Sequence, residues 1–184
     1  MGFIIFLVVV FLLVLYGVGV YNKLIRLRNQ SEESGSAIDA HLKKRYDLIP
    51  NLVETVKGYA SHEQETLTNV IKARNSAMGG STLAERNEAA NQFSHTLKSL
   101  FALSESYPDL KANQGFLDLQ NQLQVIENEL LHARKYYNAI ISDINTIVET
   151  VPSSIIASMT HFKKLDYLAI EEEARERVSV SFSK

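Results

Sequence analysis

An uncharged apolar run near the start of the chain most constrains its fold. Residues 3–20 read FIIFLVVVFLLVLYGVGV and contain no charged side chain. As a helix rising about 1.5 Å per residue, this run spans roughly 27 Å, close to the ~30 Å of a bilayer's hydrocarbon core. All 40 acidic and basic residues, 19 basic and 21 acidic, lie after position 22. We therefore predict a transmembrane anchor at residues 1–22.

A cleaved signal peptide is the main alternative for this run. Such a peptide has a basic start and a small-x-small cleavage site. Here only Met1 and Gly2 precede the run, and Tyr-Asn-Lys follows it. A buried core helix is rarely so long and so uniformly apolar. These features favour an uncleaved anchor.

The residues that follow the run predict its orientation. Tyr21, Lys23, Arg26 and Arg28, which we call the membrane junction, lie within eight residues of Val20, and no lysine or arginine precedes the run. Tyrosines prefer the headgroup level, and basic flanks stay in the cytoplasm under the positive-inside rule. We therefore expect the rest of the chain to be cytoplasmic. A cysteine at Asn113 and an impermeant thiol reagent would test this.

The long segment 113–148 carries the clearest helical pattern. Its apolar residues step by three and four, which is an a/d seam. The seam positions are Phe116, Leu119, Leu123, Ile126, Leu130, Ala133, Tyr137, Ile140, Ile144 and Ile147. Further apolar positions beside the seam make it wider than a two-stranded coiled coil needs, so a helix bundle fits better.

Three more segments read as helices. Residues 31–79 keep their apolar phase through Pro50, so we expect one kinked helix there, with a turn at Gly79-Gly80. Residues 82–106 form the next helix, and a shorter one follows Pro152. The fold class is all-α: a transmembrane helix, then an antiparallel bundle of about four long helices at 23–160. Residues 161–184 form a C-terminal tail, and alternating Val178, Val180 and Phe182 predict a short extended segment there.

Several motifs resemble the LemA family of bacterial single-pass membrane proteins. The densest are YNKLIRLRN at 21–29 and IDAHLKKRYDLIPNLVETVKGYASHEQETL at 38–67, followed by AR at 73–74, YPDLKANQGFLDLQ at 107–120, LQVIENELLHARKYYN at 123–138 and PSSIIAS at 152–158. The chain lacks the family's tryptophan before the Ile38-Asp39 pair, and residues past about 160 echo it loosely. The resemblance implies an inner-membrane protein with its N-terminus outside and a cytoplasmic helical domain. It implies no enzymatic activity.

Motifs that carry chemistry are weak. Glu129 and His132 have the Glu-x-x-His spacing of di-iron bundles, but one copy occurs and it lies beside the seam. HEQET at 62–66 lacks the second zincin histidine, so Ser61, Glu63 and Glu65 fit a helix start better. We expect no catalytic residue, metal, cofactor or small-molecule substrate. The net charge of −2 gives no sign of nucleic-acid binding.

Two polar patches remain. Lys43, Lys44 and Arg45 are interpreted as a solvated helix face. Five polar residues beside Pro50 have two interpretations that the sequence leaves open. They either bond the backbone groups freed by the proline or face solvent, or they form a surface that binds a partner. We call these the candidate surface: Asp47, Asn51, Glu54, Lys57 and His62.

These observations leave three hypotheses for function. The first is a membrane-anchored bundle that acts as a scaffold or accessory protein, in contact with the lipid bilayer and other membrane proteins. Its wide seam suggests a homo-oligomer. The second is a metal-binding bundle enzyme or an accessory subunit of a membrane enzyme. The third is an extracytoplasmic sensory or peptide-binding domain, which requires the opposite orientation.

Overall fold

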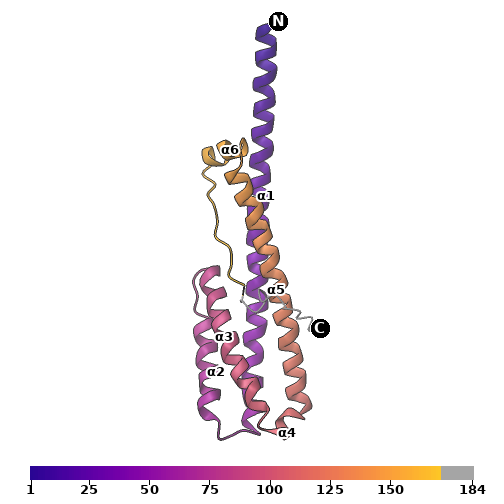
Figure 1. Ribbon diagram of the computed structural model, residues 1–184, viewed down its shortest axis with the longest axis vertical. Helices are drawn as coiled ribbons and strands as arrows, with labels where there is room; N and C mark the ends of the chain where they lie inside the picture. Colours follow the sequence, from indigo (N-terminus) through magenta and orange to yellow (C-terminus); the bar gives the residue numbers. More distant parts are fainter. Residues whose placement is uncertain (171–184) are drawn as a thin grey trace, which may run out of the picture. The chain divides into compact units, whose positions relative to one another are not determined.

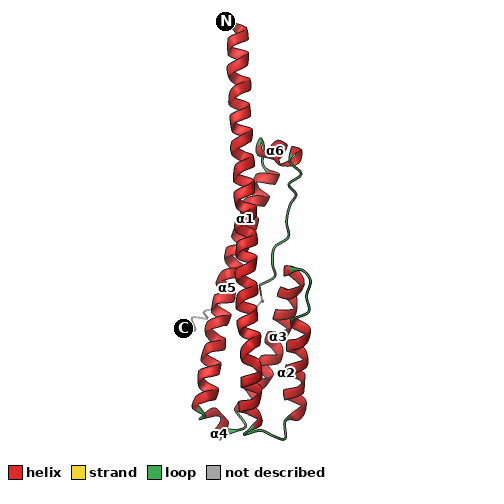
Figure 2. Ribbon diagram, turned by 180° about the vertical axis from the view of Figure 1, so that it is seen from behind, coloured by secondary structure: helices red, strands yellow, loops and turns green. Residues whose placement is uncertain are grey.

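The computed structural model describes residues 1–170, and every regular element in that range is an α-helix (Figures 1 and 2). In chain order they are α1 (Gly2–Lys57), α2 (Gln64–Ala77), α3 (Leu83–Ser104), α4 (Pro108–Lys111), α5 (Gln114–Glu149) and α6 (Ser153–Met159). The all-α prediction is confirmed. The extended segment predicted around Val178, Val180 and Phe182 lies outside the described residues.

The described chain forms two compact units, defined by contacts rather than by sequence order. Unit 1 consists of residues 1–38 and 133–167. Unit 2 consists of residues 39–132 with the described residues that follow 167. The division expected from the sequence, into an anchor at 1–22, a bundle at 23–160 and a tail at 161–184, remains a prediction.

Unit 1 has its core where α1, α5 and α6 meet. Its buried residues are Leu24, Leu27, Ile140, Ile141, Ile144, Ile147 and Ala157. The side chain of Asn145, on α5, is buried and forms two hydrogen bonds with the backbone of Leu165, at 2.9 and 2.8 Å. These bonds fasten the irregular segment that follows α6 to the end of the long helix.

The seam predicted on α5 is confirmed. Seven of its ten positions are buried, and Leu119, Ala133 and Tyr137 are partly buried. A single chain therefore covers this stripe, and its apolar width no longer supports self-association.

The first helix has 56 residues, far more than the average of about 10–14 residues in globular proteins. It nevertheless ends sooner than the apolar pattern predicts. α1 continues through Pro50, as expected, but it stops at Lys57. The prediction of one helix over 31–79 is wrong at residues 58–63. Glycine is a poor helix former, and after Gly58 the N–H of Ala60 bonds back to the Val56 carbonyl at 2.8 Å. Ala60 is buried in this turn, and α2 begins at Gln64.

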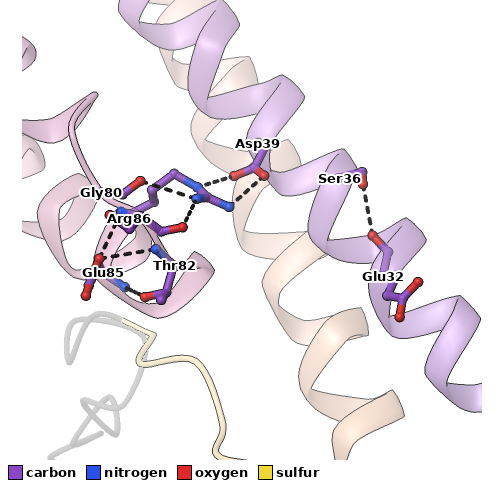
Figure 3. A network of polar contacts seen from close by, with 8 residues as sticks. Glu32, Ser36, Asp39, Gly80, Thr82, Glu85 and Arg86 are labelled. Carbon is purple, nitrogen blue, oxygen red and sulfur yellow. Dashed lines mark hydrogen bonds and ion pairs between the residues drawn. The ribbon is translucent and has the colours of Figure 1, made fainter.

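The turn between α2 and α3 is closed by a network of polar side chains (Figure 3). The Thr82 hydroxyl accepts from the Glu85 N–H, and the Glu85 carboxylate accepts from the N–H groups of Thr82 and Ser81. This capping box starts α3. Arg86 adds a two-pronged ion pair with Asp39 of α1, at 2.8 and 2.9 Å.

Two sequence predictions concern these helix starts. The glycine turn and the Thr82 cap are confirmed; a Cβ at Gly80 would lie 2.9 Å from the backbone nitrogen of Arg86, so the turn needs a glycine there. The helix start predicted at HEQET is confirmed: α2 begins at Gln64 with Glu65 in its first turn. Ser61 is not its cap, because the N-cap position is Glu63, which makes no side-chain capping bond.

Acid should weaken the capping box. The hydrogen bond from the Thr82 N–H, followed by that from Ser81, lowers the pKa of the Glu85 carboxyl below its ordinary 4.5. A group with a depressed folded pKa contributes stability above its unfolded pKa and loses it as the pH falls through the folded value. Glu85→Gln keeps an acceptor oxygen but cannot titrate. We expect thermal unfolding between about pH 5 and 3 to depend less on pH in this variant than in the parent. Equal pH slopes would contradict this.

Candidate interaction surface and membrane junction

The apolar run forms the exposed first part of α1. Its most apolar eighteen-residue window has a mean hydropathy of 3.1, and none of it is buried by the described protein. A soluble core helix of this composition would be covered. The junction residues Tyr21, Lys23, Arg26 and Arg28 follow it, and all four are exposed. The run is therefore a helix long and apolar enough to cross a bilayer, and the exposed basic residues of the junction follow it, with Arg28 3.9 Å from Glu32.

All five residues of the candidate surface are exposed. Asp47, Asn51, Glu54 and Lys57 are spaced by four, three and three residues, which places them on one stripe of α1. His62 lies beyond the end of α1, in the turn before α2. The helix therefore brings four of the five side chains onto one face.

This stripe is only lightly paired. Asp47 accepts from the Lys43 ammonium at 2.8 Å, and Lys57 lies 3.7 Å from Glu54. Both pairs are solvent-exposed, and such pairs contribute little to stability, about 0–1 kcal/mol. Their side chains are therefore available to a partner at small cost to the fold.

The backbone group freed by Pro50 has another partner. Proline lacks the N–H that would bond to the carbonyl four residues earlier, here that of Tyr46. The Arg74 Nε–H of α2 donates to this carbonyl at 2.8 Å. The candidate surface is thus not needed to repair the helix at Pro50. Its remaining interpretations are a solvated face or a binding surface.

A hollow of about 490 Å³ lies beside this stripe, between the end of α1 and α2. Its apolar lining is formed by Val53, Leu67 and Ile71. Its polar lining consists of Glu54, Lys57, Ser61, Gln64, Thr68 and Lys72. Glu54 and Lys57 belong to the candidate surface, whereas Asp47, Asn51 and His62 do not line the hollow.

The sequence interpretation missed the α2 wall of this hollow. Gln64, Thr68 and Ile71 are spaced by four and three residues, so they share one face of α2. Ile71 is half-buried and lies outside the buried stripe of Leu67, Val70 and Ala77. An apolar residue off the main stripe, between polar residues at helical spacing, is the signal that could have found this face.

The basic run at 43–45 does not behave as predicted. Lys43 and Lys44 are exposed, but Arg45 is 3% exposed and lies in the core of unit 2. Its guanidinium donates to the Ser94 hydroxyl at 2.8 Å and pairs with Glu127 at 3.1 Å. It also lies over the Phe93 ring, 5.3 Å from the centroid. The prediction of a solvated face is therefore wrong for Arg45.

A second hollow, of about 270 Å³, reaches this arginine between α3 and α5. Because Glu127 already balances the guanidinium charge, the hollow offers no uncompensated cation to an anionic ligand. Its arrangement fits a structural ion pair.

The residues considered for metal binding are dispersed. Glu129 lies 3.1 Å from Nδ1 of His41, and His132 is exposed. Within residues 1–170, no three histidine, aspartate or glutamate side chains are grouped as metal ligands would be. Glu129 therefore belongs to a two-residue contact within unit 2.

Side-chain bonds also join the connections between helices in unit 2. The Tyr107 hydroxyl donates to Glu63 at 3.0 Å, and this bond raises the pKa of Tyr107. Asn113 caps α5 by accepting from the Phe116 N–H at 2.9 Å, and its amide donates to the Tyr59 hydroxyl. Asn113 is therefore a poor position for a labelling cysteine.

An exposed apolar helix that continues into a helical domain defines a membrane-associated α-helical protein. The chain belongs to the LemA family, whose model matches residues 34–182. The match includes the region past 160 that the sequence motifs echo loosely. The family predicted from those motifs is confirmed.

The individual relatives share 20–28% sequence identity with this chain. Protein LemA of Metamycoplasma hominis is 28% identical over 171 residues, which is 90% of this chain and 75% of that protein. Magnetosome protein MamQ 2 of Paramagnetospirillum magneticum is 22% identical, over 80% of this chain and 64% of that protein. Magnetosome protein MamQ of Magnetospirillum gryphiswaldense is 20% identical with the same coverage. This chain thus spans less than two thirds of the magnetosome relatives.

Proposed function

We propose that this protein is a non-enzymatic, membrane-anchored adaptor that binds a partner protein through the hollow between α1 and α2. The hollow itself is the main support. It combines an apolar lining with exposed charges, and it includes Glu54 and Lys57 of the candidate surface. Binding surfaces of this kind have an apolar centre and a polar rim.

The charges at the hollow indicate the chemistry of the partner. Lys57 and Lys72 are both exposed, and Glu54 is the one acidic residue in the lining. The rim thus has a net charge of +1. We infer that the partner is a segment of another membrane protein with apolar residues for the lining and an acidic residue for the lysines. Complementary charge favours such a partner over a basic one.

Charge reversal at the hollow should weaken this binding. We expect a photo-crosslinking amino acid at Thr68 to capture the partner in the native cells. The same amino acid at the exposed Gln122 of α5 should not. Lys57→Glu with Lys72→Glu should reduce the adduct several-fold, because both changes place like charges opposite the partner's acidic residue.

Lys44→Glu is the matched control, because Lys44 is also an exposed lysine but does not line the hollow. It should leave the adduct intact. The thermal midpoints of all variants should stay near that of the parent. An adduct that survives the double reversal would contradict binding at the hollow.

We further propose that the chain sits in the bacterial inner membrane with its helical units in the cytoplasm. The basic junction supports this orientation. The chain has no cysteine, so single substitutions can be labelled selectively. Asn121 is exposed on α5. We expect Asn121→Cys to react with an impermeant maleimide only after the cells are permeabilised, and Gly2→Cys to react in intact cells.

Labelling of Asn121→Cys in intact cells would show that the helical units lie outside the cytoplasm. That result would favour the extracytoplasmic sensory or peptide-binding hypothesis. Self-association remains a separate prediction, and native mass spectrometry in detergent tests it. A spectrum with monomers alone would contradict it.

A further inference from the structure

The segment around α6 has an unusual composition for a surface turn. Residues 150–162 read TVPSSIIASMTHF and contain no aspartate, glutamate, lysine or arginine. The segment contains one histidine, His161, near its end; Glu149 precedes the segment, and Lys163 and Lys164 follow it. The pattern resembles a short apolar insertion bounded by charges.

Unit 1 holds α6 beside the apolar run of α1 (Figure 1). Ile156, Met159 and Thr160 line a hollow of about 420 Å³ whose other lining residues are Val10, Leu13, Val14, Gly17, Val18 and Tyr21. A Cβ at Gly17 would lie 3.4 Å from Cδ1 of Ile156. At about 1.5 Å per residue, Val10 to Val18 lie roughly 3–15 Å inside the end of the run at Val20. α6 is thus level with part of the segment that crosses the bilayer.

Several apolar side chains of this segment are uncovered. Val151, Ile155 and Met159 are 81%, 57% and 73% exposed, although Ala157 on the other side is fully buried in the core of unit 1. Ile155 and Met159 are four residues apart and share one face of α6. Transfer of apolar side chains from water to an acyl-chain environment lowers the free energy.

Two hydroxyls of the segment, those of Ser153 and Thr160, are satisfied by its own backbone. Hydroxyls in a membrane are costly unless they are hydrogen-bonded. The Ser153 hydroxyl donates to the Thr150 carbonyl at 2.9 Å, and the Thr160 hydroxyl donates to the Ile156 carbonyl at 2.8 Å. The Phe162 N–H bonds to the Ala157 carbonyl at 2.9 Å, which closes the end of the helix.

Charges mark where the segment would leave the acyl chains. Lys164 forms a 2.7 Å ion pair with Glu149, and both side chains are more than half exposed. The lysine stems are long enough to reach the headgroups while the adjacent chain lies deeper. The junction residues Lys23, Arg26 and Arg28 add positive charge on α1 of the same unit.

From the level of α6, its uncovered apolar side chains, the internally bonded hydroxyls of Ser153 and Thr160, and the charges at both ends of the segment, we propose that α6 is embedded in the lipid leaflet next to the membrane junction. The chain then contacts the bilayer twice, through the crossing helix and through the 150–162 segment. The inference rests on the membrane anchor of the proposed function, but not on the hollow between α1 and α2.

Fluorescence quenching by lipid can test this with the full chain. The cysteine-free sequence permits Met159→Cys, and Ile155→Cys as a second position on the same face, each carrying an environment-sensitive dye. The protein is reconstituted into phosphatidylethanolamine and phosphatidylglycerol vesicles with a nitroxide on the acyl chains. Phe11→Cys in the crossing helix is the positive control. Ser142→Cys on the exposed side of α5 is the negative control.

We expect the nitroxide lipid to remove most of the emission at 159, 155 and 11, and little at 142. Quenching at 159 and 155 that equals the value at 142, while 11 is quenched, would overturn the embedding of α6 and leave the anchor intact. Absence of quenching at 11 would overturn the anchor, and the proposal would fall with it.

Discussion

Replacing Arg45 by alanine should lower the stability of the protein more than any change on the surface of α1. The guanidinium is nearly inaccessible, and it connects α1 to Ser94 of α3 and Glu127 of α5. Loss of one partner of a buried ion pair costs about 3–5 kcal/mol. Glu127 is 35% exposed and can reach water, so we expect the lower end, about 3 kcal/mol. A loss of that size lowers the thermal midpoint by roughly 6–12 °C.

Thermal unfolding followed by circular dichroism, with the full chain in detergent, measures this effect. Lys44→Ala is the matched control, since it removes the neighbouring exposed cation and should change stability by less than about 0.5 kcal/mol. Glu127→Gln should have an intermediate effect, because the guanidinium keeps its bond to Ser94. If Arg45→Ala and Lys44→Ala unfold within about 2 °C of each other, the buried pair is not structural.

The second large effect concerns Arg74 and Pro50 together. Pro50 has no N–H to donate to the Tyr46 carbonyl, and the Arg74 side chain donates to that carbonyl instead. Arg74→Ala removes this hydrogen bond. Hydrogen bonds from charged donors contribute about 1.5–3 kcal/mol, so we expect a loss in this range. Pro50→Ala restores a backbone N–H at the required position. In that background, Arg74→Ala should cost well under about 1 kcal/mol.

The four proteins of this double-mutant cycle test the coupling directly. Lys72→Ala, an exposed cation two residues away on α2, should show no coupling to position 50. Equal costs of Arg74→Ala with proline and with alanine at position 50 would show that the arginine acts elsewhere. In either case the thermal midpoints of the single variants give the size of each contribution.

Local patterns predicted most of the helices. The three-and-four spacing on 113–148 found α5 and its buried stripe, and the length and uniformity of the apolar run found the exposed part of α1. Gly79-Gly80 and Thr82 marked the start of α3 because turn and capping preferences act over a few residues. The family followed from motifs spread over most of the chain.

Contacts between distant residues could not be predicted in the same way. Arg45 lies beside two lysines, and its spacing does not show that it reaches Ser94 and Glu127 across two other helices. Arg74 repairs α1 at Pro50 from 24 positions away, so the proline alone did not reveal its partner. The break at Gly58 was hidden because the apolar phase continues from Val56 to Leu67. The hollow is lined by one face of α1 and one face of α2, and the sequence pattern indicated only the face of α1.

The bonds that join the connections of unit 2 bear on how a partner would recognise it. The α1–α2 turn is held by Tyr107 and Asn113, and the α2–α3 turn by Glu85 and Arg86. These bonds hold both ends of α2, which forms one wall of the hollow. A preorganised surface loses little conformational entropy on association, so even a small contact area can support useful affinity. Recognition here would be governed by how fast the complex separates rather than by slow ordering of loops.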